Sequence, residues 1–281
     1  MSAPPNSSAP SRSRCPRIIR VVATSTALMA LRYRGLIAHR PPFLDREWDE
    51  DVAVLAGVVQ RPDGRIALTD VRDWTYTRDS ITAKRYFDRD YRPDDVVGMW
   101  LYEQALDGVG LIAHTFLVFE FDDSYGDDRW LGLSVETRRE SHEEYSIVRG
   151  MLREFEVTHI CANEAYLVLR RVEYLDYPLL RYRLDIPVEY QARIVAKMTA
   201  ETDALSQSPR WYHTALHNCT SSLIRYVNES EPDAIPLHYS YVFTGKIDEY
   251  LERLGYLDRG SAEDITRDFL ADSDVRPAVA P

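Results

Sequence analysis

The feature that most constrains the fold is a pair of apolar, β-forming segments separated by a short acidic turn. Residues 110–121 read GLIAHTFLVFEF and residues 129–139 read RWLGLSVETRR. The sequence DDSYGDD lies between them and contains Gly126, which is typical of a turn. Two such runs with a short connection predict an antiparallel hairpin. A chain with this hairpin is expected to build an antiparallel sheet and to cover its apolar faces.

The rest of the chain falls into a strand-rich block followed by a helical block. Alternating and β-rich patterns predict an opening strand or hairpin at residues 64–77 and further strands at 155–162 and 179–186. Apolar residues at helical spacing predict helices at residues 187–207, from residue 218 onward, and at 245–254. Residues 163–174 fit a helix and a strand equally well. Hairpins followed by helices indicate an α+β fold with an antiparallel sheet packed on helices.

The two ends of the chain differ from this central part. Residues 1–41 are expected to form a disordered leader, and the run VVATSTALMAL at residues 21–31 is too short to span a bilayer. Its apolar character and basic flanks are signal-like or anchor-like, so membrane association through this segment is compatible with the sequence. We expect one domain over residues 42–270 and a tail over residues 271–281.

Charge and cysteine content exclude some classes of protein. The chain has 34 Lys and Arg against 45 Asp and Glu, a net charge of −11, which argues against nucleic-acid binding. Its three cysteines are too few for a disulfide framework. Cys15 lies in the leader, and Cys161 lies in a predicted strand, where a cysteine is usually a small buried hydrophobic residue.

Cys219 lies at a position in the sequence that is favourable for a reactive thiol. Asn218 is a favourable N-cap, so Cys219 is expected to be the first residue of a helix. The helix dipole and the free N–H groups at that position stabilise a thiolate, and the N–H groups can also receive a developing oxyanion. A half-buried structural cysteine is the alternative that this position leaves open.

His114 and Glu136 are the candidate partners of Cys219. Strand alternation places His114 on one face with Ile112 and Phe116. If the hairpin turn centres on Tyr125, His114 stands opposite Glu136, where a carboxylate can hold the ring and stabilise the imidazolium. The alternatives are a core histidine bonded to a carbonyl group and a strand carboxylate paired with Arg138.

A zinc site is the competing hypothesis. His213, His217 and Cys219 lie close together in the sequence, and His114 or His159 would supply a fourth ligand. The spacing matches no closed structural zinc pattern, so no metal and no other cofactor is expected. A zinc-dependent hydrolase remains the alternative enzyme class.

The order of these motifs resembles a known family. The segments IAHTFLVFEF, LGLSVETRRE and WYHTALHNCTSSL follow one another as in the N-terminal periplasmic domain family of the lipoprotein N-acyltransferase Lnb. The segments FLDREWDEDVAVL, ALTDVRDWTY and FTGKIDEYLERLGYLD extend the resemblance over roughly residues 42–258.

The resemblance implies a circularly permuted papain-like fold, in which the histidine precedes the cysteine. It further implies thiol-dependent acyl transfer or hydrolysis of an amide or ester in the cell envelope or periplasm, although a cytoplasmic location stays open. The catalytic residues would be Cys219, His114 and Glu136, and the substrate a lipid, lipoprotein or peptidoglycan-type molecule. Further residues are assigned to the substrate or the oxyanion from their place in the motif order: Tyr212, Asn218, Arg138, Asn163 and Glu164. A non-catalytic binding module on the same fold is the second alternative.

Overall fold

The computed structural model describes residues 28, 41–43 and 45–266. The compact unit to which the central part belongs begins at Pro42. The predicted leader (apart from Leu28 and Pro41) and the predicted tail at residues 271–281 lie outside the described residues. No helix in the described ranges has both the length and the apolar character that crossing a membrane requires.

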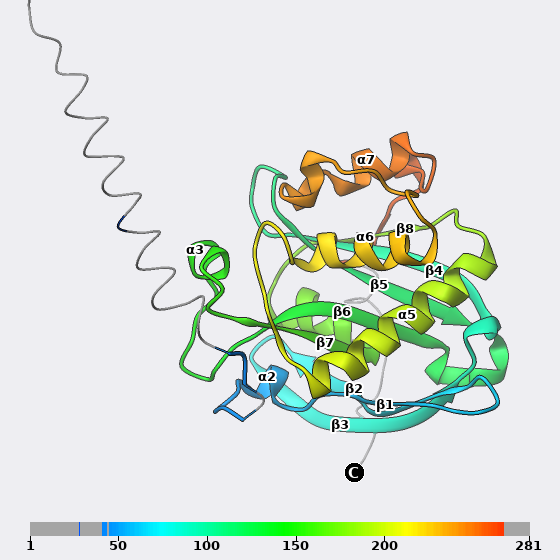
Figure 1. Ribbon diagram of the computed structural model, residues 1–281, viewed down its shortest axis with the longest axis horizontal. Coiled ribbons are helices and arrows are strands. Elements are labelled where there is room, and N and C mark those ends of the chain that lie inside the picture. Colours follow the sequence, from blue (N-terminus) through cyan, green and yellow to red (C-terminus); the bar gives the residue numbers. More distant parts are fainter. Residues whose placement is uncertain (1–27, 29–40, 44, 267–281) are drawn as a thin grey trace, which may run out of the picture. The chain divides into compact units, whose positions relative to one another are not determined.

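A large, mostly antiparallel sheet forms the centre of the molecule (Figure 1). Its order is β1-β2-β7-β6-β5-β4-β8-β10, with β3 paired to β2 and β9 paired to β7. Among the described strands, only β2 and β7 pair in parallel. The strands are β1 (Gly57–Gln60), β2 (Ile66–Thr77), β3 (Ser80–Tyr91), β4 (Val96–Ala105), β5 (Ala113–Phe121), β6 (Trp130–Arg138), β7 (Glu156–Asn163), β8 (Leu179–Arg183), β9 (Arg210–Trp211) and β10 (Glu263–Asp264).

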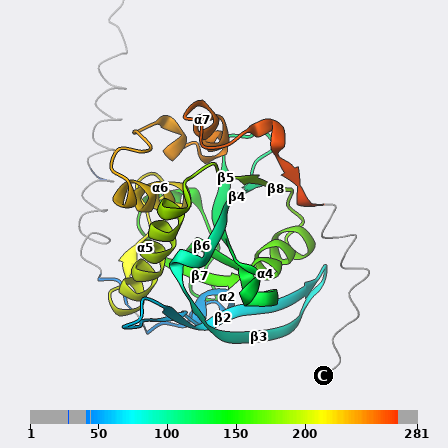
Figure 2. The ribbon, with the colours of Figure 1, turned by 90° about the vertical axis from the view of Figure 1, so that its right-hand side faces the viewer.

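Helices cover both faces of this sheet. The α-helices of the described part are α2 (Glu50–Ala53), α3 (Ile147–Met151), α4 (Glu164–Leu169), α5 (Val188–Gln207), α6 (Cys219–Ser230) and α7 (Ile247–Arg253). In Figure 2, α5 and α6 lie on one side of the sheet and α4 on the other. The predicted α+β class is therefore confirmed.

Two apolar clusters, one on each face, hold the layers together. Leu117 and Phe119 of β5 belong to the cluster that includes α5 and α6 side chains, whereas Phe116 and Val118 belong to the cluster that includes α4. This is the alternation expected for a strand that is buried on both faces. His114 shares the α4 face because it is two residues from Phe116.

The predicted hairpin is confirmed, and its register is the one expected for a turn centred on Tyr125. Leu117 pairs with Leu133 and Val118 pairs with Gly132. The predicted helices at residues 187–207, 218 onward and 245–254 correspond to α5, α6 and α7.

Three local features differ from the expectation or resolve it. Residues 66–77 form one strand and not a hairpin, and this strand pairs with β3. The apolar pattern does not predict β3, because its side chains are mostly exposed or half-buried and therefore polar. The ambiguous segment 163–174 is helical: α4 continues into a π-helical turn at Arg170–Tyr174.

Candidate active site

Cys219 is the first residue of α6, as the N-cap prediction requires. The Asn218 side chain accepts a hydrogen bond from the backbone N–H of Ser221 at 2.7 Å, and the Ser221 hydroxyl accepts one from the Asn218 N–H at 3.0 Å. This capping box fixes the start of the helix. In the described part of the chain, the backbone N–H groups of Cys219 and Thr220 have no hydrogen-bond partner. They are thus free to bind a negatively charged oxygen.

His114 projects from β5 toward β6 and contacts Glu136. Its Nε2 atom lies 3.1 Å from Oε1 of Glu136 and 2.9 Å from the hydroxyl oxygen of Ser134. Ser134 in turn donates a hydrogen bond of 2.8 Å to the same carboxylate oxygen. The predicted juxtaposition of His114 and Glu136 across the hairpin is therefore present. With Nε2 occupied, Nδ1 is the ring nitrogen left for the Cys219 thiol.

The thiol and the imidazole perturb each other's protonation. Burial by itself raises the pKa of Cys219, but the His114 charge and a hydrogen bond with its ring lower that pKa to about 7. Burial by itself lowers the pKa of His114, but the charges of Glu136 and Cys219 raise it to about 9. Between these two values the pair exists as thiolate and imidazolium.

Arg171 belongs to the same group as Cys219, His114 and Glu136, although the sequence gives little indication of this. It lies in the π-helical turn after α4 and is 1% exposed. It donates to Oε1 of Glu136 at 2.8 Å, and its guanidinium carbon lies 4.3 Å from the centroid of the Phe116 ring. Burial would raise the pKa of Glu136, but the charges of His114 and Arg171 hold that pKa well below its usual range. The adjacent arginines in the apolar segment AYLVLRRV are the signal that could have revealed it.

Cys219 and His114 both line a cavity of about 550 Å³ at one end of the sheet. Most of the surface of this cavity is apolar, and the side chains that contribute to it include Ile112, Val135, Ile160, Leu167 and Phe243. Polar or charged residues also line it, including Glu136, Arg170, Tyr166, Tyr177 and Tyr212. Mostly apolar walls with a few convergent polar groups are typical of a small-molecule site.

Gln104 is a second residue of this cavity that the sequence analysis missed. It lies on β4 as the cross-strand partner of His114 and is 4% exposed. Its carboxamide has no hydrogen-bond partner within the described residues, and the residue lines the cavity. A buried amide normally has a partner, so this one is available to a bound molecule.

Two of the residues assigned to the oxyanion line the cavity but differ in what they can do. Tyr212 is buried, and its pKa is raised well above the ordinary value by burial and by the nearby Cys219 charge. The Asn218 side chain does not have the free donor that its predicted role requires. Its amide donates to the carbonyl oxygens of Thr214 and Tyr241, each at 2.7 Å. Both amide hydrogens are therefore used, and the Asn218 side chain cannot donate to an oxyanion.

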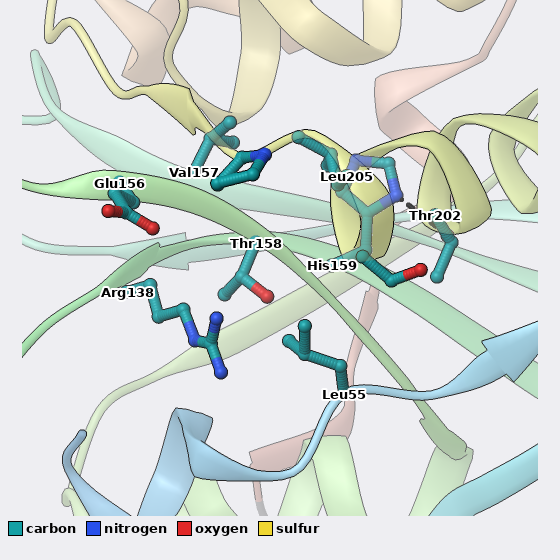
Figure 3. A pocket seen from close by; sticks show the side chains of 10 residues that line it. Leu55, Arg138, Glu156, Val157, Thr158, His159, Thr202 and Leu205 are labelled. Atoms are coloured by element: carbon teal, nitrogen blue, oxygen red, sulfur yellow. Dashed lines mark hydrogen bonds between the residues drawn. The ribbon is translucent and has the colours of Figure 1, made fainter. Parts of the chain in front are cut away.

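Arg138, Asn163 and Glu164, which the sequence analysis assigned to the substrate groove, do not line the cavity. Arg138 donates to the backbone carbonyls of Val52 and Ala53 and borders a second, small cavity near Glu156 and Thr158 (Figure 3). The pairing register of β6 and β7 explains why Asn163 and Glu164 lie away from the cavity.

β7 pairs Asn163 with Leu131, at the turn end of the hairpin, but pairs Thr158 with Glu136. Asn163 therefore lies at the far end of β7, where it caps α4 and contacts Asp73. Glu164 follows it and receives a hydrogen bond from Arg181 at 2.9 Å.

The histidines of the zinc hypothesis have other partners. His213 and His217 form a backbone bridge, and Nδ1 of His213 accepts from the Ala215 N–H at 3.1 Å. His159 is buried and hydrogen-bonded to Thr202 and Tyr226. Over the described ranges, no three His, Cys, Asp or Glu side chains are arranged to hold a metal ion.

Comparison with protein-family models identifies the family. The model of the Lnb N-terminal periplasmic domain matches residues 82–245, more than half of the chain. The chain belongs to the Lnb N-terminal periplasmic domain family. The predicted resemblance and the predicted cell-envelope or periplasmic location are thereby confirmed.

The Lnb N-terminal domain match includes His114, Glu136 and Cys219. The family is the N-terminal domain of an enzyme, Lnb, so the chain is related to an acyltransferase-like protein. Searches of curated proteins and of solved structures found no match to the chain.

Proposed function

We propose that this protein is a thiol enzyme that transfers or hydrolyses an acyl group, with Cys219 as nucleophile and His114 as base. The observation that carries the proposal is the continuous chain of contacts from Cys219 through His114 to Glu136. A thiol with a pKa of about 7 at a helix start, next to an imidazole that lies 3.1 Å from a carboxylate, is the arrangement that nucleophilic catalysis requires.

The reaction would proceed in two steps. His114 takes the thiol proton, and the Cys219 sulfur attacks the carbonyl carbon of an amide or ester. The resulting oxyanion accepts hydrogen bonds from the Cys219 and Thr220 N–H groups, with Tyr212 close to the thiol. The leaving amine or alcohol takes the proton from His114. Water or an amine then attacks the thioester and gives its proton to His114, which restores the thiol.

Glu136 orients the His114 ring and stabilises the imidazolium, and Arg171 and Ser134 hold Glu136 in place. Ser134, Arg171 and His114 all contact the same carboxylate oxygen, Oε1 of Glu136. The role is that of the third member of a catalytic triad.

We propose that the fold is a circularly permuted papain-like domain over residues 42–270. Two features support this. The histidine strand precedes the cysteine helix in the chain, and α6 packs on the sheet beside β5 and β6 with its N-terminus at the His114 end. The mostly apolar cavity suits a lipid, lipoprotein or peptidoglycan-type substrate whose carbonyl group reaches Cys219, and the Gln104 amide is available to hydrogen-bond a polar group beside that carbonyl.

The test is the reactivity of Cys219 toward iodoacetamide as a function of pH, followed by mass spectrometry of its peptide. We expect the wild-type rate to rise with a midpoint near pH 7, below the ordinary thiol value of 9.0. Cys161 is the internal control: it is a buried free cysteine whose pKa burial raises to about 12, so it stays unlabelled.

His114→Ala separates the proposal from its alternatives. Without the imidazolium, the midpoint for Cys219 is expected to move to about 9 or above, because burial then acts alone. An unchanged midpoint in His114→Ala, or a wild-type midpoint near 9, would favour a non-catalytic binding module. Stoichiometric zinc in the purified protein would favour the hydrolase that uses a metal ion.

A further inference from the structure

Two threonines, Thr115 on β5 and Thr220 on α6, place their hydroxyl groups next to the Cys219 thiol. The two hydroxyl oxygens lie 2.9 Å apart, and the Thr220 oxygen lies 3.9 Å from the Cys219 sulfur. Thr115 is 0% exposed and Thr220 is 2% exposed. Within the described part of the chain, neither hydroxyl has another hydrogen-bond partner. The three groups are therefore joined in the order Thr115, Thr220, Cys219.

The surroundings of the two hydroxyl groups are otherwise apolar. Both threonines line a small cavity of about 40 Å³, whose other walls are aliphatic side chains, Met99 and Tyr256. Valine has nearly the shape of threonine and would suit these walls better, because burying a hydroxyl group carries a desolvation cost. Packing alone thus does not account for two hydroxyl groups at this place.

The position of Thr220 in α6 leaves its hydroxyl without a carbonyl acceptor. A threonine inside a helix normally donates to the carbonyl four residues before it, as Thr199 of α5 does to Val195 at 2.9 Å. Thr220 is the second residue of α6, so the residue four positions before it precedes the helix. The Thr220 hydroxyl is therefore available to the sulfur.

Loss of the thiol proton fixes the direction of these hydrogen bonds. A thiolate can only accept, so the Thr220 hydrogen must point to the sulfur. The Thr220 oxygen can then accept only from the Thr115 hydroxyl. Burial raises the pKa of Cys219, whereas His114, the Thr115 backbone N–H and the Thr220 hydroxyl lower it, in that order.

We propose that the Thr220 hydroxyl is a catalytic donor to the Cys219 thiolate and that Thr115 is a positioning residue that orients this hydroxyl. The inference rests on the proposed thiol function, because it concerns the same sulfur. A hydrogen bond to a charged acceptor is stronger than one to a neutral acceptor, so the contact favours the thiolate over the thiol. In the second step of the reaction the sulfur leaves as a thiolate, and the same hydrogen bond eases its departure.

The test is the pH midpoint for iodoacetamide labelling of the Cys219 peptide in wild type, Thr220→Val, Thr115→Val and the double variant. We expect Thr220→Val to raise the midpoint by about 0.5–1 pH unit, because the thiolate loses a donor. Thr115→Val should raise it by less, since the Thr220 hydroxyl and the Thr115 N–H both remain. The double variant should match Thr220→Val, because the Thr115 hydroxyl acts only through Thr220.

Thr199→Val is the matched control. Thr199 is also buried, and its hydroxyl bonds only to carbonyl groups of its own helix, so this variant should keep the wild-type midpoint. The double valine variant should be as stable as wild type or more stable, since it replaces both partners of a buried hydrogen bond with apolar groups of the same shape. A change in the midpoint without a loss of stability is a result that a purely structural role would not give.

Thr220→Ser and Thr220→Ala form a second pair in which only serine keeps the hydroxyl, with circular dichroism to check folding. The midpoint should be higher in Thr220→Ala than in Thr220→Ser. Equal midpoints in this pair, or an unchanged midpoint in Thr220→Val, would overturn the role of Thr220. A double variant whose shift is the sum of the two single shifts would overturn the positioning role of Thr115.

The two proposals about this sulfur fail in different ways. A wild-type midpoint near the ordinary thiol value of 9.0 would count against the thiol enzyme. The difference between Thr220→Val and wild type would still decide whether the hydroxyl stabilises the thiolate, because it is measured from whatever midpoint the wild type has.

Discussion

Glu136→Gln is the change that isolates the source of thiol activation. The carboxylate lies 3.1 Å from His114 Nε2, and two charges at that distance attract by about 5 kcal/mol at an effective dielectric constant near 20. The His114 pKa is raised from 6.5 to about 9 against the effect of burial, which corresponds to roughly 3 kcal/mol of stabilisation of the imidazolium. The attraction is thus large enough to account for the shift after the burial cost.

The Glu136→Gln substitution keeps the shape of the side chain but removes its charge. The largely buried imidazole is then expected to be neutral at pH 7, and the thiol, without its counter-charge, should have a pKa at or above its ordinary 9.0. The thiolate fraction at pH 7 falls from about one half to about one hundredth. A more basic thiolate is intrinsically more nucleophilic, so the alkylation rate should fall by only about five- to eightfold.

The assay is the second-order rate constant for alkylation of Cys219 by iodoacetamide between about pH 6 and pH 10. The midpoint should move upward by about 2 pH units in Glu136→Gln. Glu120→Gln is the matched control, because Glu120 lies in the same strand as His114 but at the other end, where it accepts from Trp100. A midpoint that stays near 7 in Glu136→Gln, with the fold intact, would refute the reasoning.

Three further changes probe the surroundings of the thiol. Arg171→Met removes the buried guanidinium that pairs with the partly exposed Glu136 carboxylate and should lower the free energy of unfolding by about 1.5–3 kcal/mol in urea denaturation; a loss below about 1 kcal/mol would contradict this. Asn218→Ala removes the capping box and two hydrogen bonds to loop carbonyls, so it should cost about 1–2 kcal/mol and slow alkylation of Cys219 at pH 7. Gln104→Leu removes an amide that has no protein partner in the described part, so the free energy of unfolding should be unchanged or about 1 kcal/mol higher. The same variant should lower kcat/KM for a p-nitrophenyl ester roughly tenfold, and an unaffected kcat/KM would show that the amide does not contact the substrate.

Much of the fold follows from local patterns in the sequence. The hairpin of β5 and β6 is predictable because two apolar β-forming runs flank an acidic turn, and its register follows from the position of Tyr125 at the centre of that turn. The helix start at Cys219 is predictable because Asn218 is a local cap. β3 is not predictable in this way, since its exposed, polar side chains carry no apolar alternation.

The residues of the candidate site differ in the same way: some follow from local sequence patterns and others do not. Cys219, His114 and Glu136 can be found from the sequence because a helix start and a cross-strand pair are short-range relations. Gln104 and Arg171 cannot be found in this way. Each lies on another element, β4 or the turn after α4, whose position next to the site is set by the packing of the whole sheet. Asn163 and Glu164 follow the site residues in the chain, but the antiparallel direction of β7 places them at the other end of the sheet, away from the cavity.

The sequence by itself determined the hairpin, the helix start and the pairing of His114 with Glu136, because each depends on residues that are neighbours in one strand pair or one helix turn. Only the tertiary structure decided which face α6 covers, which buried arginine neutralises Glu136, and which polar groups remain unpaired in the cavity. These outcomes depend on how layers pack against each other, and that packing is set by many weak contacts between residues far apart in the chain.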